Sequence, residues 1–106
     1  MIRAAKKDDN HNDIAQAFIR GGAVVLDVSQ LKRCCDIVIA YRGITVAVEI
    51  KDGTKVPSAR KLTEGEKEFA DNWSRQGKWA LIEHVWQVIE LLNSITANAK
   101  IKELEQ

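Results

Sequence analysis

Two stretches of alternating residues, joined by Arg42-Gly43, constrain the fold of this chain more than any other feature. Apolar side chains recur at every second position from residue 36 to 41 and again from 44 to 51. Such alternation is typical of β-strands with one buried face, and a two-residue connection containing glycine favours a tight hairpin. We therefore expect two antiparallel strands at residues 36–41 and 44–51.

The register of this hairpin sorts its side chains onto two faces. With two turn residues, Tyr41 pairs with Ile44 and, counting outward, Asp36 pairs with Glu49. Asp36, Glu49 and Lys51 then share one face. Like charges that lie opposite each other destabilise a sheet, so this pair favours a cation between the carboxylates, and oxygen ligands suit magnesium. The other face is apolar and is expected to face the core: Ile37, Ile39, Tyr41, Ile44, Val46 and Val48.

The alternative for the charged face is simple exposure to solvent, which is the usual place of charged side chains. Val38 and Ala47 share that face and argue that it is partly buried. The first helix presents Asp13, Gln16 and Arg20 at spacings of three and four. Asp13 is therefore expected to add a third carboxylate over the same face.

The rest of the chain predicts three helices and two further strands. A helix at residues 12–20 is expected to begin at Asn10 or Asn12, to end at Gly21-Gly22, and to be followed by a strand at residues 23–27. Residues 52–62 read as a loop, and residues 63–66, with the sequence Thr-Glu-Gly-Glu, form a capping-box pattern that begins a helix ending near residue 75.

A strand at residues 79–82 and a final helix, with an apolar stripe from Val85 to Leu92, complete the order. The expected fold class is α/β, a single compact αβββαβα domain with a mixed central sheet. The domain spans residues 1–106, with a core at about 8–95 and a polar C-terminal tail at 96–106.

Composition limits the class of protein. No apolar run approaches the roughly 18 residues that cross a bilayer, and the first residues lack the apolar core of a signal peptide, so a cytoplasmic location is expected and no membrane partner. A net charge of +1 does not by itself indicate a nucleic-acid binder. Basic residues cluster locally, however, at Lys51, Lys55, Arg60 and Lys61, where either phosphate contact or a solvated loop is consistent with the pattern.

Other chemistry-bearing residues fit simpler roles. Cys34 and Cys35 are adjacent and, with two scattered histidines, lack the paired spacing of a zinc site. We expect His11 at the surface rather than as a catalytic base. The three tryptophans are expected in the core rather than as platforms for unpaired bases: Trp73, Trp79 and Trp86.

Asp36, followed by the run Val-Glu-Ile-Lys at residues 48–51, resembles the motif of the PD-(D/E)XK nuclease superfamily. A wider set of positions is similar to the VRR-NUC branch, found as stand-alone bacterial and phage proteins and as the nuclease module of the Fanconi-associated nuclease. The resemblance covers residues 3–95 and depends most on residues 10–14, 49–53, 57–63 and 67–69.

This resemblance implies a restriction-endonuclease-like core and a homodimer that hydrolyses phosphodiester bonds of branched DNA, as a Holliday-junction resolvase does, in a bacterial or phage-infected cell. Magnesium is the implied cofactor, with manganese able to substitute. Asp36 and Glu49 would be metal ligands together with the backbone carbonyl of Ile50, while Asp13 would act through water. Lys51 would be the catalytic lysine. The expected DNA contacts are Lys32, Arg33, Lys55, Arg60 and Lys61.

The chain departs from the family pattern at three places. Asp13 stands where the family has glutamate, and Glu66 stands where relatives often have glutamine. Residues 32–35, Lys-Arg-Cys-Cys, replace a glycine-rich loop and proline. Two alternatives remain: a branched-DNA-binding module without catalysis, against which the intact set of Asp36, Glu49 and Lys51 argues, and a nickase or restriction-type enzyme, for which the chain has little length to read sequence.

Overall fold

A computed structural model describes residues 7–105, so residues 1–6 and 106 of the expected domain lie outside the described part. The predicted order αβββαβα is confirmed there, with a short 3₁₀ helix added inside the predicted loop at residues 52–62. Pro57 begins that helix, where its missing N–H has no hydrogen bond to lose. The elements are α1 (His11–Arg20), β1 (Val24–Asp27), β2 (Ile37–Tyr41), β3 (Ile44–Ile50), η1 (Pro57–Arg60), α2 (Glu64–Ser74), β4 (Lys78–Ile82) and α3 (Val85–Glu105).

The four strands form one mixed sheet in the order β1-β2-β3-β4 over the residues described. β1, β2 and β3 pair antiparallel, whereas β3 and β4 are parallel. The predicted hairpin register is confirmed from Tyr41 opposite Ile44 to Val38 opposite Ala47. Arg42 and Gly43 both have positive φ, +49° and +81°, as a two-residue turn that follows the twist of the strands requires.

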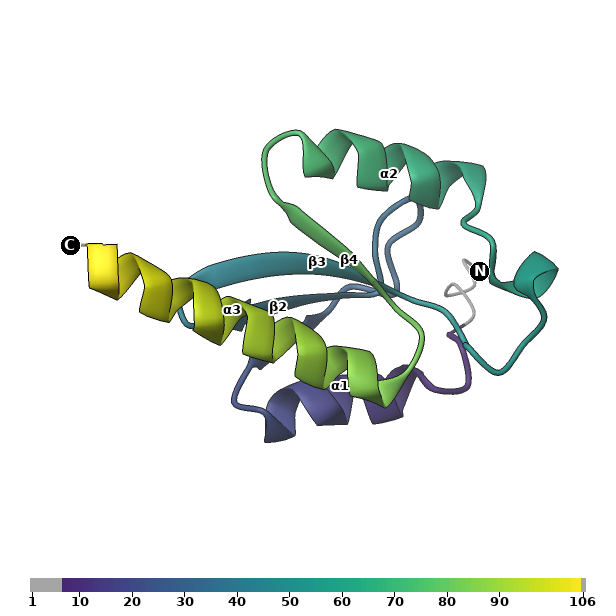
Figure 1. The fold of residues 1–106 in the computed structure, drawn as a ribbon. Helices are drawn as coiled ribbons and strands as arrows, with labels where there is room; N and C mark the ends of the chain where they lie inside the picture. The colour runs from purple at the N-terminus through teal and green to yellow at the C-terminus, as the bar shows by residue number, and fades with distance from the viewer. Residues whose placement is uncertain (1–6, 106) are drawn as a thin grey trace.

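The core lies on one face of the sheet. Figure 1 shows α1 and α3 side by side on that face and α2 on the opposite face. The hairpin face predicted to be apolar supplies much of the core, and Tyr41 and Ile44 pack against its margin. The buried residues of this cluster are Ile14, Phe18, Ala23, Ile37, Ile39, Val46, Val48, Ile50, Ile82, Val88, Leu92 and Ile95.

Asn10 fastens the start of α1 to the sheet. It precedes the helix, as predicted, but its side chain makes no capping hydrogen bond. Its Nδ2 instead donates to the backbone carbonyls of Lys51 and Glu83, at 3.0 and 3.1 Å. These two carbonyls lie just beyond the ends of the parallel strands β3 and β4. One amide therefore holds three segments of the chain together beside the C-terminal end of β3.

We expect Asn10→Ala to lower the free energy of unfolding by about 1–3 kcal/mol, because both carbonyls lose their donor in a partly buried place. Denaturant unfolding measures the change. Asn12→Ala is the matched control, since Asn12 is exposed on the first turn of the same helix. Equal stability of the two variants would contradict this role for Asn10.

The predicted polar tail at residues 96–106 is helical as far as the structure describes it, because α3 continues without a break to Glu105. Alanine, lysine, leucine and glutamate dominate its last turns, and their helix propensity favours the helix where packing is sparse. Figure 1 shows this end of α3 projecting beyond the sheet. None of the helices within residues 7–105 combines the length and apolar character needed to cross a membrane.

Candidate active site

A cleft of about 310 Å³ opens at the C-terminal end of β3. The sequence placed Asp36, Glu49 and Lys51 on one face, and the structure brings all three into the wall of this cleft. Strand geometry accounts for Glu49 and Lys51, since side chains two residues apart point to the same side. The remaining lining residues are Asp8, Ser29, Leu31, Lys32, Arg33, Cys34, Cys35, Thr63 and Glu66.

Asp36 and Glu49 are neighbours, but the expectation that they form a regular ladder pair is wrong. β2 begins at Ile37, and the Asp36 N–H donates to the Val48 carbonyl at 3.1 Å. The Asp36 carboxylate accepts the Ile50 N–H at 2.7 Å, in the position that a further strand residue would otherwise occupy. In a strand the N–H and C=O of one residue point to the same side, so the Ile50 carbonyl is directed toward Asp36 as well.

Glu49 is a buried carboxyl, with 2% of its surface exposed. Burial raises its pKa far above the usual range, and the adjoining Glu66 and Asp36 carboxyls raise it further. The neutral, protonated form is therefore favoured in the protein without a cation. Asp36 and Glu66 lie within hydrogen-bonding reach of this proton.

Lys51 is held by Glu66, the N3 residue of the predicted capping box. Its Nζ donates to Glu66 Oε1 at 2.8 Å, and the same oxygen accepts the Thr63 N–H at 2.7 Å. Burial raises the pKa of Glu66, but hydrogen bonds from Glu49, Lys51 and Thr63 outweigh it and lower that pKa to about 2. Burial lowers the pKa of Lys51, and the Glu66 carboxylate more than reverses this effect. The result is a charged ammonium fixed in the wall of the cleft.

The sequence indicated the capping box but not its link to Lys51. The box is confirmed, because the Glu66 N–H also donates to the Thr63 hydroxyl at 3.2 Å. Local spacing specifies contacts within the first turn of α2. It does not specify which strand that turn will approach, so the Lys51 contact had no signal in the sequence.

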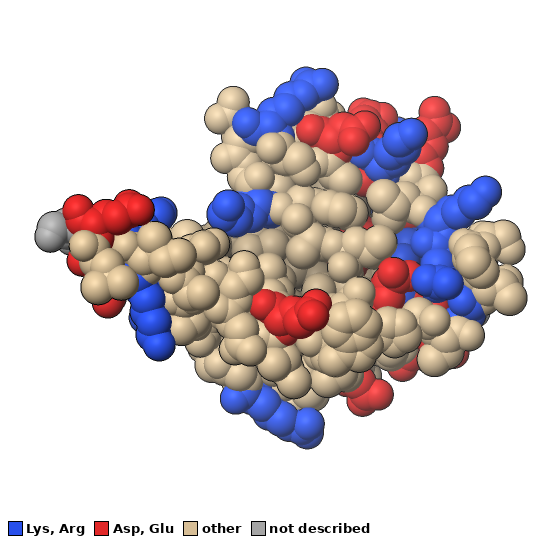
Figure 2. Space-filling view, viewed as in Figure 1, with Lys and Arg blue, Asp and Glu red and all other residues tan. Residues whose placement is uncertain are grey.

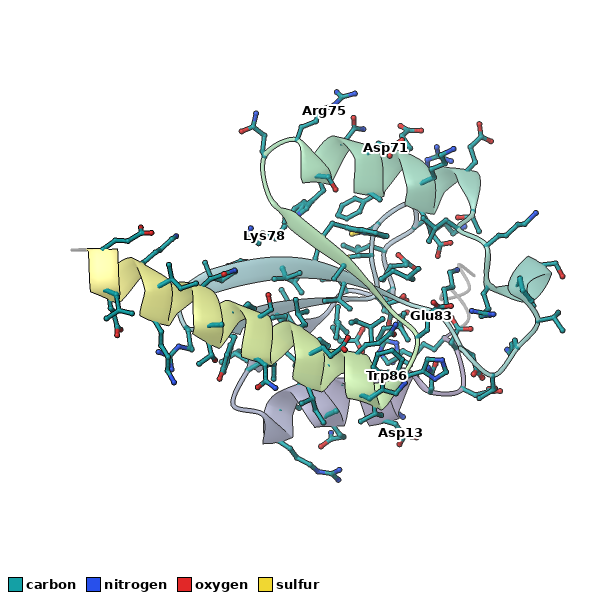
Figure 3. All side chains as sticks on the ribbon, viewed as in Figure 1. Asp13, Asp71, Arg75, Lys78, Glu83 and Trp86 are labelled. Atoms are coloured by element: carbon teal, nitrogen blue, oxygen red, sulfur yellow. The ribbon has the colours of Figure 1, made fainter. Side chains whose placement is uncertain are left out.

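Asp8, rather than Asp13, is the acid that the N-terminal segment brings to the cleft. Asp8 lines the cleft, where burial raises its pKa while the charges of Lys51 and Lys55 lower it. Asp13 is exposed and is not among the lining residues, and Figure 3 shows it pointing outward from α1. Because Asn10 fixes the start of α1 beside β3, the residues that precede the helix reach the cleft. The placement of Asp13 over this face is therefore wrong.

The expected DNA-contacting residues divide into two groups. Lys32 and Arg33 line the cleft, and Lys55 is close enough to act on Asp8. Arg60 instead stabilises the loop, since it donates to Glu83 Oε2 at 2.8 Å and to the Lys55 carbonyl at 2.7 Å. Lys61 is exposed. Figure 2 shows basic side chains gathered over the loop that carries η1, beside several carboxylates.

His11 is buried, so its expected place at the surface is wrong. Its Nε2 lies 3.0 Å from Asp27 Oδ2, and the other Asp27 oxygen accepts the N–H and the hydroxyl of Ser29. Ser29 in turn lines the cleft, so this cluster shapes one wall. The prediction that Trp86 lies in the core is also wrong, because this residue is 56% exposed on α3. Trp73 and Trp79 are half-buried.

The acids of the cleft suit a magnesium ion in donor type. No group of three or more His, Cys, Asp or Glu side chains within residues 7–105 has the arrangement of a complete metal site. Magnesium, however, keeps several waters and needs only one or two carboxylates. Asp36, Glu49 and the Ile50 carbonyl would supply three oxygen donors, at a place where burial and the adjoining acids raise the pKa of Glu49.

Comparisons with protein-family models, with curated proteins and with solved structures found no match to this chain.

Proposed function

We propose that this protein is a magnesium-dependent DNA endonuclease that cuts branched DNA, with the restriction-endonuclease-like core of the VRR-NUC branch. One observation carries the proposal: Asp36 and Glu49 adjoin in the same cleft as a fixed, charged Lys51. Lys32 and Arg33 at this cleft supply charge for the DNA backbone. The proposal includes a homodimer, since the described part of one chain offers one such cleft and a junction has two strands to cut.

The residues of the cleft have distinct roles in this reaction. Asp36, Glu49 and the Ile50 carbonyl would hold the ion, and Glu49 would be ionised there, with its proton lost to solvent. A bound magnesium ion supplies charge neutralisation and a more acidic water. Lys51 places its ammonium against a non-bridging phosphate oxygen, where negative charge accumulates as the bond to phosphorus forms. Glu66 keeps the Lys51 side chain in place from α2.

A panel of labelled DNA substrates tests the proposal. Four-way junctions, flaps, splayed arms and plain duplex are incubated with magnesium, manganese or calcium, and products are separated on denaturing gels. We expect cleavage of branched substrates with magnesium or manganese. Binding of junctions without cleavage under every condition would favour the non-catalytic module, and products cut in one strand alone would favour a nickase.

Asp8 and Asp13 provide a matched pair for the geometry. We expect Asp8→Asn to reduce the cleavage rate by about tenfold or more, because it removes a carboxylate that faces the reacting groups. Asp13→Asn makes the same chemical change on the same segment but outside the cleft, so its rate should stay within about twofold of wild type. Initial rates on the preferred substrate measure both. Loss of activity in Asp13→Asn alone would contradict the structural assignment.

A further inference from the structure

A second cavity, of about 510 Å³, lies along α2 beside the candidate active site. Most of its lining comes from one stripe that runs along α2 and into the turn after it, with Gly65 and Gly77 at either end and Arg33 opposite. The stripe residues recur at spacings of one and three, which places them on a single face. They are Glu68, Phe69, Asn72, Trp73 and Gln76. We call this cavity the α2 groove.

The wall of the α2 groove is aromatic and fixed in place. The rings of Phe69 and Trp73 stack with centroids 5.5 Å apart and an interplanar angle of 25°. The indole N–H of Trp73 donates to the Lys78 carbonyl at 2.7 Å, which sets the orientation of the ring. A Cβ at Gly77 would lie 2.7 Å from the indole nitrogen, so glycine at this position leaves room for that arrangement. A flat ligand would therefore meet a wall that is already formed.

The remaining lining offers polar contacts of two kinds. Asn72 and Gln76 are exposed amides on the same stripe, and each can both donate and accept hydrogen bonds. Arg33 lines both the α2 groove and the active-site cleft. The Arg33 guanidinium pairs with Glu68 Oε2 at 2.6 Å, and the two side chains are 60% and 62% exposed. Exposed pairs of this kind contribute little to stability, so a phosphate can replace Glu68 as the partner of Arg33.

We propose that the α2 groove binds an unpaired nucleobase of the DNA whose neighbouring phosphate occupies the active-site cleft. The aromatic wall can stack on the π-face of a base, and the two amides can form hydrogen bonds with its edge. The shared arginine can bind the phosphate of the same nucleotide. This inference rests on the proposed function, and it assigns the feature that distinguishes branched or single-stranded DNA from plain duplex, namely an unstacked base.

The test uses a five-nucleotide thymidine oligomer and the same sugar–phosphate backbone without bases, with calcium in place of magnesium. The Trp73 indole resonance is followed by NMR and assigned with Trp73→Phe. We expect the oligomer to shift this resonance and to bind about 5- to 100-fold more tightly than the backbone without bases. Equal binding of the two ligands, or an unmoved Trp73 signal, would overturn the inference. A Trp73 shift that follows protein concentration instead would identify a second copy of the chain as the occupant.

A pair of charge variants separates the α2 groove from general electrostatics. Asn72→Glu places a negative charge in the groove, and Ser74→Glu places it about 200° around the same helix. Both positions are exposed, so folding should be preserved. We expect only Asn72→Glu to weaken oligomer binding, by about tenfold, and equal effects would overturn the inference. No step of this test requires cleavage, so the two proposals can fail separately. Base binding without nuclease activity would reject the proposed function but support base binding in the α2 groove. Cleavage without a preference for bases would reject base binding in the groove but leave the proposed function standing.

Discussion

Lys51→Ala and Glu49→Gln are each expected to lower the rate of magnesium-dependent DNA cleavage by about 10²–10³-fold. Lys51 is the charged group fixed against the cleft, and Glu49 is one of the two adjacent carboxyls proposed to hold the ion. Affinity for DNA should change little, because backbone contacts at several basic residues supply most of it. Single-turnover rates on a four-way junction, with binding measured separately in calcium, give both quantities.

Lys61→Ala serves as the control for the loss of a positive charge. Lys61 is exposed and lies outside the lining of the cleft. The variant should bind DNA slightly more weakly, and its affinity should depend less on salt concentration. Its maximal cleavage rate should stay near that of wild type. If Lys51→Ala or Glu49→Gln kept more than about a tenth of the wild-type rate, the assignment of the active site would fail.

Glu49→Gln is also expected to stabilise the metal-free protein at neutral and higher pH. Burial, with Glu66 and Asp36 adjoining, raises the pKa of Glu49 above its value in the unfolded chain, which is about 4.3. The folded state then holds the proton more tightly, so wild-type stability falls as pH rises above that value. At pH 7 the variant should exceed wild type by about 1–3 kcal/mol, which raises Tm by at least about 4 °C for a domain of this size.

The pH dependence distinguishes this effect from a simple packing change. Near pH 4 the two proteins should unfold with similar midpoints, because Glu49 is then largely protonated in both states. Glu90→Gln, at an exposed position on α3, should show no such gap at any pH. Magnesium should stabilise wild type more than the variant, since ligand binding to the folded state adds to stability. A gap that is the same at pH 4 and pH 8 would contradict the raised pKa of Glu49.

Alternation within the hairpin predicted much of the site because a strand has only two faces. Once Arg42-Gly43 fixed the turn, Glu49 and Lys51 had to share the side opposite the apolar residues. Asp36 followed from the same count, although β2 begins one residue later, at Ile37, and the Asp36 carboxylate accepts the Ile50 N–H in place of a backbone contact. Local periodicity could not reveal that irregular end, because it depends on where the chain turns away toward residue 35.

Contacts between separate elements were harder to predict. Asp13 has favourable helical spacing, yet the roll of α1 is set by the burial of Ile14 and Phe18 and by Asn10, whose side chain binds outside its own helix. The capping box at Thr63 is a local pattern and was predicted, whereas the approach of Glu66 to Lys51 depends on how α2 crosses the sheet. Exposure of Trp86 likewise reflects the packing of α3 rather than the residue type.

The parallel pairing of β3 and β4 has a consequence for the order of folding. The β2–β3 hairpin closes through two residues, and such hairpins form within microseconds. β3 and β4 are joined by residues 51–77, so their pairing must close a much longer loop and comes later. Glu66, which holds Lys51, lies inside that loop, and Asn10 binds across the ends of both strands. An incompletely folded chain therefore has the acids of the hairpin without a positioned lysine, so the complete cleft exists only once the domain is closed.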